Sequence, residues 1–502
     1  MADAKREIER KYESDDSGLP DLTGVGGVAA VLDKGLVELD ATYYDTADER
    51  LADAALTLRR RTGGSDAGWH LKFPVEPGVR DEIRAPLSDT VPEEIAALVR
   101  SRVRDAELIP LVRLRSARDV RHLVDADGAL LAEASVDAVT AERLGGAGGA
   151  AQWTEIEVEL ADDGDPAFLD RVEKRLRKAG VRPSKSPSKL ARALEQTGGP
   201  RCGSRRKSKP APPETAGDHV LAYLRAQRDV LVELDPAVRR DVPDSVHRMR
   251  VATRRARSTL RSFRSVLDRT VTDPIGVELK WLAGELGLDR DQEVMAERLT
   301  AALDALPPGL VTGPVRERLA AWSETRHGGA HSHLTDVLDS RRYLALLDTL
   351  DGLLAGLPLR KAAAKQPDKV LAKAVDKDLA TLSALVEQAI GAPPGEERDI
   401  AVHEARKKAK RTRYAAEAAT PALGKPARSL TKAMKSLTTL LGEHQDSVMT
   451  RSTLRELSAV AHEAGESAFT YGVLYGREEQ RAATAEAELP ALWTEIESGA
   501  TV

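Results

Sequence analysis

Glutamates recur at every second position in two short segments of the chain. Glu7 and Glu9 lie in REIERKY, and a second set, Glu155, Glu157 and Glu159, lies in EIEVEL. In a β-strand this spacing places each set on one face. Carboxylates crowded on one face repel one another unless a cation lies between them, and Mg²⁺ or Mn²⁺ prefers carboxylate oxygens. The two segments are therefore candidate metal-binding strands.

Basic residues show the same alternation in other segments. The candidate phosphate ligands are Lys11 after the first glutamate pair, Arg59 and Arg61 in LRRR, Lys72 in WHLKFP, and Arg113 and Arg115 in VRLR. Arginine and lysine bind phosphate oxygens, arginine often through two parallel hydrogen bonds. A triphosphate with a bound divalent cation would satisfy both the basic and the acidic set. The pattern therefore favours a metal–triphosphate ligand.

These charged strand faces are compatible with two architectures. In the simpler one, an antiparallel sheet buries its apolar face and exposes the charged face to solvent. However, the strands sort by sign, some carrying mainly carboxylates and others mainly basic groups. We therefore predict that the sheet closes, so that the charges line a lumen. The apolar face would then point outward beneath helices, one of them near 165–179.

The first part of the chain resembles the CYTH domains, or triphosphate tunnel metalloenzymes. The resemblance covers roughly Lys5 to Leu194 and rests on EIERK, YYDTADERLADAALTLRRR, WHLKFP, EIEVEL and SKSPSKLARAL in this order. It implies an eight-stranded antiparallel tunnel that hydrolyses or cyclises triphosphates with a divalent metal. The metal-side carboxylates would be Glu7, Glu9, Glu155, Glu157 and Glu159, and Asp137 of the alternating segment EASVD is a further metal candidate. The triphosphate side would comprise Lys11, Arg59, Arg61, Lys72, Arg113, Arg115, and Lys185 or Lys189.

The expected reaction is metal-assisted phosphoryl hydrolysis, with Glu7, Glu9, Lys11 and Lys72 as the catalytic set. The basic wall would hold the phosphates, and the metal would bridge phosphate oxygens while a second ion or a glutamate orients water. Neither a covalent nucleophile nor a glycine-rich phosphate loop stands out. His70 is expected to be a hydrogen-bonded wall residue.

Composition and a linker divide the chain. Its 502 residues are 41% hydrophobic and 31% charged, which is typical of soluble globular proteins. The segment 197–217, TGGPRCGSRRKSKPAPPETAG, is typical of a flexible linker. We predict an α+β protein with a β-rich domain over 1–196 and an all-helical domain over 218–502. Cys202 is the only cysteine, and neither a membrane span nor a signal peptide fits, so we expect a cytoplasmic protein.

Seven arginines and a histidine, with no acid, occupy HRMRVATRRARSTLRSFR at 247–264. On a helix, one arc would hold a stripe roughly 25 Å long that comprises His247, Arg250, Arg254, Arg257, Arg261 and Arg264. Solvated helix faces usually mix signs, so an acid-free stripe better suits a long, regularly charged anion. The segment recurs 156 residues later as HEARKKAKRTR, with His403, Arg406, Lys410 and Arg413 on the equivalent face before Glu417 interrupts it.

The later part of the chain resembles the CHAD family over about Asp218 to Pro490, through both basic segments and the leucine–glycine–aspartate motifs that follow them. The resemblance implies duplicated four-helix bundles, about 218–355 and 366–495, with inorganic polyphosphate in a basic channel between them. Lys280 and Lys435 would add to this channel, and Asp291 and Asp446 would pair with the basic helices. DNA is the rival ligand for a basic stripe. It is disfavoured because no helix-turn-helix, zinc-finger or zipper pattern is visible and the net charge is -5.

The leading hypothesis is a Mg²⁺- or Mn²⁺-dependent triphosphatase tethered to a polyphosphate-binding helical domain. The first alternative is a non-catalytic polyphosphate binder associated with polyphosphate granules. The second is an adenylate cyclase, which would use the same tunnel with an internal hydroxyl as the nucleophile. Triphosphate-containing small molecules and inorganic polyphosphate are the expected partners, without a membrane.

Overall fold

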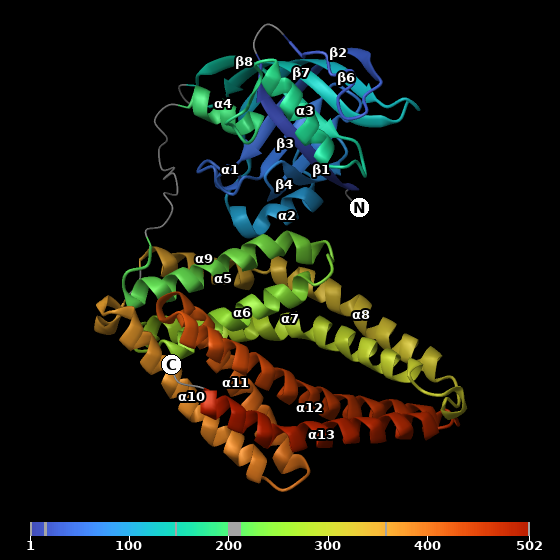
Figure 1. The fold of residues 1–502 in the computed structure, drawn as a ribbon, viewed down its shortest axis with the longest axis vertical. Coiled ribbons are helices and arrows are strands. Elements are labelled where there is room, and N and C mark those ends of the chain that lie inside the picture. Colours follow the sequence, from blue (N-terminus) through green and yellow to red (C-terminus); the bar gives the residue numbers. More distant parts are fainter. Residues whose placement is uncertain (1–2, 15–17, 146–147, 199–211, 357–358, 500–502) are drawn as a thin grey trace. The chain divides into compact units, whose positions relative to one another are not determined.

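The computed structural model describes residues 3–14, 18–145, 148–198, 212–356 and 359–499, without the side chains of 288–293 and 326–330. Cys202 and most of the predicted linker therefore lie outside the described residues. The chain forms two compact units, Met1–Lys209 and Pro210–Val502. The first is a closed β-structure and the second is helical (Figure 1), which confirms the predicted α+β class.

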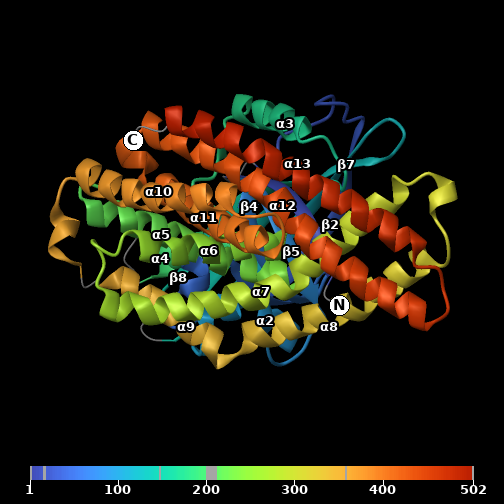
Figure 2. The ribbon, with the colours of Figure 1, turned by 90° about the horizontal axis from the view of Figure 1, so that it is seen from below.

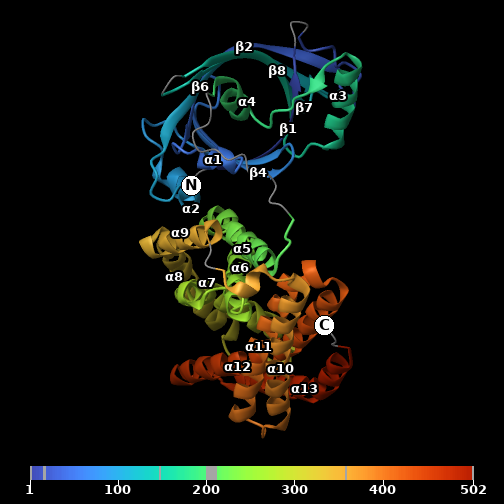
Figure 3. The same ribbon diagram turned by 90° about the vertical axis from the view of Figure 1, so that its left-hand side faces the viewer.

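Eight antiparallel strands close into a barrel in the first unit (Figure 3). They are β1 (Asp3–Glu13), β2 (Ala30–Asp45), β3 (Thr57–Thr62), β4 (Gly68–Glu76), β5 (Val79–Ala85), β6 (Ile109–Val124), β7 (Leu130–Arg143) and β8 (Ala150–Leu160). The order around the ring is β5-β4-β3-β2-β6-β7-β8-β1, and β1 pairs again with β5 to close it. The two-residue strand β9 (Arg182–Pro183) pairs with the end of β1.

Alternation along each strand separates the barrel's two faces. On β8, for example, Glu157 and Glu159 line the central cavity. Ile156 and Val158 between them are buried in the cluster formed with Phe168 and its neighbours. The charged faces thus point inward and the apolar faces outward, as the sorting of strands by sign predicts.

Helices cover the apolar outer surface of the barrel. The helix α3 (Ala167–Lys178), predicted near 165–179, packs on β1, β7 and β8 through Phe168 and Leu176. The helix α2 (Glu93–Val103) packs on β3, β4 and β5 through Ile95 and Val99, next to the short helix α1 (Arg50–Asp53).

One further helix, α4 (Lys189–Thr197), packs inside the ring. Its Leu190 and Leu194 contact inward-facing apolar residues of β2, β6, β7 and β8, among them Leu114 and Trp153. In Figure 3 this helix lies within the barrel outline. Its N-cap residue Ser188 accepts a hydrogen bond from the Ala191 amide, which fixes the start of the helix at the cavity. One stretch of the lumen is therefore apolar and filled, and the charged cavity occupies the remainder.

The second unit contains nine α-helices in the described part of the chain, joined by 3₁₀ turns at Pro308–Leu310 and Lys361–Ala364. The first set is α5 (Ala216–Arg239), α6 (Ser245–Ser262), α7 (Arg269–Asp304), α8 (Val315–Asp339) and α9 (Arg341–Ala355). The second set is α10 (Pro367–Gly391), α11 (Glu396–Leu423), α12 (Lys425–Glu463) and α13 (Phe469–Gly499). None of the described helices carries an apolar stretch of the length that a bilayer crossing requires.

The two basic segments lie on α6 and α11, which are neighbours in the helical unit (Figure 2). Arg255 of α6 donates to Glu417 of α11 at 2.9 Å, and Arg411 donates to Ser262 Oγ at 3.2 Å. Both helix sets also contribute to one continuous apolar core. The duplicated sequence motifs are therefore brought together at one contact.

The β3–β4 loop gives a direct test of the backbone geometry at the cavity. Gly63 has φ +81°, and a Cβ there would clash with the backbone oxygen of Glu38. Gly128 has nearly the same φ, +82°, but open space around it. We expect Gly128→Ala to lower the free energy of unfolding by about 1 kcal/mol and Gly63→Ala by at least about 2 kcal/mol more, as measured by urea unfolding. Equal losses would contradict the close backbone approach at Gly63.

Candidate active site in the barrel

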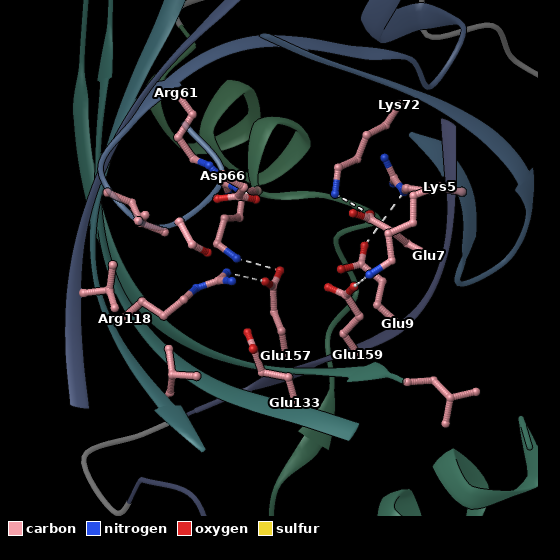
Figure 4. A pocket seen from close by; sticks show the side chains of 18 of the residues that line it. Lys5, Glu7, Glu9, Arg61, Asp66, Lys72, Arg118, Glu133, Glu157 and Glu159 are labelled. Atoms are coloured by element: carbon pink, nitrogen blue, oxygen red, sulfur yellow. Dashed lines mark hydrogen bonds and ion pairs between the residues drawn. The ribbon is translucent and has the colours of Figure 1, made fainter. Parts of the chain in front are cut away.

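The barrel encloses a cavity of about 540 Å³ whose walls are mostly ionic. Glu7, Glu9 and Glu159 lie across the cavity from Arg61 and Arg118, and Glu157 lies between the two sides and pairs with Arg118 (Figure 4). Nine of the side chains predicted to bind metal or phosphate line this cavity: Glu7, Glu9, Lys11, Arg59, Arg61, Lys72, Glu157, Glu159 and Lys189. Residues more than 150 positions apart in the sequence thus meet in one enclosed space.

Three carboxylates stand side by side on adjacent strands of one wall. Glu9 on β1 is the register partner of Glu159 on β8, and Glu159 is in turn the partner of Glu133 on β7. Burial raises the pKa of Glu159, and the charges of Glu9 and Glu133 raise it further, while Lys72 and Lys5 oppose the rise. We call Glu9, Glu133 and Glu159 the acidic row. Such a row is stabilised by a cation placed between its members.

A second carboxylate group, formed by Asp137, Glu155 and Glu157, is fully buried. Their oxygens lie within 4.8 Å of one another, a spacing that suits one metal ion. In this structure Lys189 Nζ lies 2.9 Å from Asp137, 2.8 Å from Glu155 and 2.5 Å from Glu157. These carboxylates raise the pKa of Lys189 against the effect of its burial. The ammonium group of α4 is therefore the one cation of the described residues that contacts all three carboxylates, and Arg118 and Lys11 add further positive charge.

The cations of the opposite wall come from β3 and β6. Arg59 lies 3.5 Å from the Tyr43 hydroxyl and 3.8 Å from Glu82. Arg61 pairs with Asp66 of the β3–β4 loop. Arg118 donates to both oxygens of Asp137 and to Glu157, each at 2.7 Å. The wall thus presents guanidinium groups that carboxylates already hold in place.

A third ionic group surrounds Glu7. Its carboxylate pairs with Lys72, and Lys72 also lies 3.4 Å from the buried Glu82. Burial raises the pKa of Glu7 to about 7, although Lys72 lowers it. His70, predicted as a wall residue, is buried with Nδ1 2.9 Å from Glu82 and Nε2 2.9 Å from the carbonyl oxygen of Asp66. His70 therefore links the Glu82 carboxylate on β5 to the backbone of the β3–β4 loop.

Three predicted phosphate ligands lie elsewhere. Arg113 and Arg115 are on the outer face of β6, where Arg113 donates to Asp40 at 2.9 Å and Arg115 lies 3.9 Å from Glu142. Even-numbered residues of β6, such as Arg118 and Val120, point into the cavity, whereas odd-numbered Arg113 and Arg115 point outward. Arg118 is therefore the arginine that β6 contributes to the cavity. Lys185 is exposed before α4 and does not line the cavity. The placement of Arg113 and Arg115 in the lumen was wrong, and of the alternatives Lys185 and Lys189 it is Lys189 that lines the cavity.

Several cavity residues were missed as site candidates. Glu133 lies between two alanines, as the predicted ligands lie between apolar residues, whereas Arg118 is followed by Asp119; Arg80 and Arg84 enter from β5. Alternation shows which residues of a strand share a face, but only the pairing of the strands shows which of the two faces points into the barrel. Asp66 was missed for another reason, because it lies in a loop where alternation says nothing about direction.

The acidic row and the buried cluster differ in geometry. Among the described carboxylates of the barrel, three oxygens converge within 4.8 Å only at Asp137, Glu155 and Glu157. In the acidic row, Lys11 Nζ lies 3.1 Å from Glu9 and Lys5 Nζ lies 3.5 Å from Glu159. At the buried cluster, by contrast, a metal ion would have to displace Lys189. The carboxylate chemistry of the cavity thus fits a Mg²⁺- or Mn²⁺-type ion, without distinguishing the two.

In the helical unit, the basic segments form a crowded contact rather than a freely solvated face. Arg250 and Arg254 of α6 approach Arg406 and Lys410 of α11. Burial, followed by the charges of Arg254, Arg406 and Arg250, lowers the pKa of Lys410 to about 7. Asp446 lies 3.7 Å from Arg406 and provides a partial counter-charge. Repulsion among cations here would be relieved by a bound anion.

The other members of the predicted stripes differ in their surroundings. Arg413 donates to Glu417 at 3.1 Å, and His403 Nδ1 lies 2.6 Å from Gln445 Oε1, so both already have protein partners. Arg264 lies beyond the end of α6 and is therefore outside the helical arc. Arg257 is partly buried; Arg261, Lys280, Lys435 and His247 are exposed. The side chain of Asp291 lies outside the described residues.

Comparison with known proteins separates the same two parts of the chain. The CYTH domain model matches residues 5–194, and the CHAD domain model matches residues 222–455. This chain joins a CYTH domain to a CHAD domain. The uncharacterized proteins MT2285 and Rv2226 of Mycobacterium tuberculosis are each 39% identical to it over 491 residues, covering 94% of this chain and 92% of theirs. The chain therefore belongs to the same CYTH–CHAD family as these proteins.

Three solved structures each match part of the chain. PptA from Streptomyces chartreusis is 25% identical with a TM-score of 0.47, over 56% of this chain and 100% of that chain. The CHAD domain from the plant Ricinus communis is 22% identical with a TM-score of 0.44, over 57% of this chain and 92% of that chain. HpAC1 from Hippeastrum, reported to have a dominant triphosphatase activity, is 18% identical with a TM-score of 0.23, over 40% of this chain and 99% of that chain.

The raised pKa of Glu7 predicts a pH-dependent stability in EDTA. The folded state binds this proton more tightly than the unfolded state, so stability falls as pH rises from about 4.5 to 7. Glu7→Gln removes this dependence. The stability of the variant relative to wild type should therefore rise by roughly 2–3 kcal/mol between pH 5 and pH 8, measured by urea unfolding. Glu142→Gln on the outer face is the control, and parallel pH profiles for Glu7→Gln and wild type would contradict the assignment.

Proposed function

We propose that the CYTH domain hydrolyses triphosphates with a divalent metal ion, and that the CHAD domain binds inorganic polyphosphate. The observation that carries the catalytic part is the meeting, in one enclosed cavity, of the acidic row and an arginine-bearing wall. Each wall alone would have a simpler explanation as a set of ion pairs. Together they match a ligand that is anionic along its length and carries a cation on one side.

Glu9 and Glu159, which are register partners on β1 and β8, are the residues we assign to the metal ion, with Glu7 and Glu133 beside them. When bound, the ion would supply Lewis-acid polarisation of phosphate oxygens. Arg59, Arg61 and Arg118 would bind the phosphate chain from the other wall, and Lys11 and Lys72 would neutralise charge on the transferred and leaving groups. Glu7, whose pKa lies near neutrality, is suited to accept a proton from the attacking water.

The cavity lining favours a triphosphate chain over recognition of a nucleobase. Tyr43 is the one aromatic ring among the described lining residues, apart from the imidazole of His122, and its hydroxyl faces Arg59. A stacking surface for adenine is therefore not evident. This favours hydrolysis of inorganic triphosphate or related compounds over cyclisation of ATP.

The proposal for the CHAD domain is supported by the basic groups that α6 and α11, the two duplicated helices, bring close together. These groups are Arg250, Arg254, Arg406 and Lys410. Burial and then the charges of Arg254, Arg406 and Arg250 lower the pKa of Lys410, and a phosphate chain would supply the counter-charge that these cations share. A linear polyanion can contact both helices along their stripes. Association with polyphosphate granules would follow from this binding.

Activity is tested by phosphate release from tripolyphosphate, ATP and thiamine triphosphate with Mg²⁺ or Mn²⁺. We expect Glu9→Gln and Lys11→Ala each to lower kcat/KM for the preferred substrate by at least about a hundredfold. The control is Glu173→Gln, which removes the same charge from α3, where Glu173 pairs with Arg10 and Arg177. A wild-type protein inert toward all three substrates would refute the catalytic proposal and leave a non-catalytic binder.

Polyphosphate binding is tested on the full chain with Arg250→Glu and Arg254→Glu combined. Reversing two charges at the contact between α6 and α11 should weaken binding of a long polyphosphate chain by roughly a hundredfold and flatten its salt dependence. The control is Arg269→Glu with Arg316→Glu, the same charge change at exposed residues that pair with Asp273 and Asp304. Undiminished affinity in the stripe variant would exclude the stripe as the binding site.

A further inference from the structure

One cation of the cavity is held by a loop carboxylate rather than by a strand. Arg61, only 6% exposed, contacts Asp66, the one carboxylate of the described residues with which it pairs. In Figure 4, Asp66 points into the cavity toward Arg61. Arg61 Nε has no hydrogen-bond partner. The guanidinium group therefore retains donor capacity that Asp66 does not use.

Arg61 lies in an unfavourable place for a cation. Burial, and then the charges of Arg59 and Arg118, lower the pKa of Arg61 to about 9. Arg118 has two strand carboxylates of its own, Asp137 and Glu157. Asp66 is thus the group that offsets the charge of Arg61 when no ligand is present.

The loop that carries Asp66 is anchored through its backbone and leaves the side chain able to turn away. The Asp66 carbonyl oxygen accepts a hydrogen bond from buried His70, and the loop begins with Gly63 and Gly64 at φ +81° and +73°. The Asp66 side chain itself remains 33% exposed. Moving the carboxylate off Arg61 therefore requires a side-chain rotation and leaves the anchored backbone in place.

We propose that Asp66 is a built-in competitor for a phosphate subsite: it occupies Arg61 in the empty tunnel and is exchanged for a phosphate oxygen of the incoming triphosphate. This inference rests on the proposed function and adds a control of affinity to it. Displacing Asp66 costs the same free energy for any ligand that binds Arg61. A triphosphate contacts several cations at once and offsets this cost, whereas a single orthophosphate has other cations of the cavity to bind and can leave Asp66 in place. Asp66 thus weakens the binding of ligands that occupy Arg61.

The test compares wild type, Asp66→Asn, Arg61→Gln and the double variant as full-length proteins. Tripolyphosphate and orthophosphate are titrated calorimetrically in EDTA, so that no turnover occurs and the helical domain contributes equally to each titration. Asp66→Asn should bind tripolyphosphate roughly five- to tenfold more tightly and orthophosphate by the same factor at most, because only a ligand that occupies Arg61 has to displace Asp66. In the Arg61→Gln background the same substitution should have no effect, because the cation that it releases is absent.

Asp162→Asn is the matched control. It removes a carboxylate that lines the same cavity and lies 3.2 Å from Lys5, and it should change either affinity less than twofold. Unchanged or weaker binding by Asp66→Asn would overturn the inference, as would a gain that persists without Arg61. The proposed function fails separately, if wild type with Mg²⁺ or Mn²⁺ releases no phosphate while Asp66→Asn still tightens binding.

Discussion

The double pairing of β1 is the constraint on which the barrel and its site depend. The first half of this strand pairs with β5 and the second half with β8, and this closes the ring. An open sheet could present Glu7, Glu9 and Lys11 to bulk water, where their charges would be screened. Closure places them opposite the cations of β3 and β6 instead. The chemistry of the site is thus a consequence of topology as much as of residue type.

Closure also requires that buried charges compensate one another. Glu157 illustrates this: burial raises its pKa, but Lys11, Lys189 and Arg118 together lower it well below its usual range. The compensation is uneven across the cavity. The cluster around Glu157 is saturated with cations from three elements. In the acidic row, burial and then the charges of Glu9 and Glu133 raise the pKa of Glu159, although the pKa of Glu9 itself is lowered by Lys11 against the effect of its burial. Such unevenness marks where an additional cation stabilises the protein most.

The alternation in the sequence predicted that the inner face of the barrel is charged, but it did not identify every residue on that face. Alternation correctly indicated inward glutamates on β1 and β8 because each strand has a single uninterrupted parity. On β6 both parities carry arginines, at 113 and 115 and again at 118, and only pairing with β7 shows that Arg118 shares a face with Asp137. Lys189 was recognised from a motif, yet its position among three carboxylates depends on α4 packing inside the ring. Long-range register, rather than local pattern, decides these cases.

In the helical domain, a glycine of a neighbouring helix lies beside each of two arginines of the crowded basic contact. Arg250 lies against Gly287 of α7, where an added Cβ would be only 3.2 Å from the guanidinium group. Arg406 lies against Gly442 of α12, with the corresponding Cβ 3.5 Å away. The two arginines are 156 positions apart and the two glycines 155, so that the duplicated motif repeats a contact as well as a sequence. The contact is tight at Gly287 and of ordinary van der Waals distance at Gly442, so the space beside the guanidinium group is narrower in the first copy than in the second. In both copies, the arginine of the basic segment lies on the helix surface that the leucine–glycine motif forms.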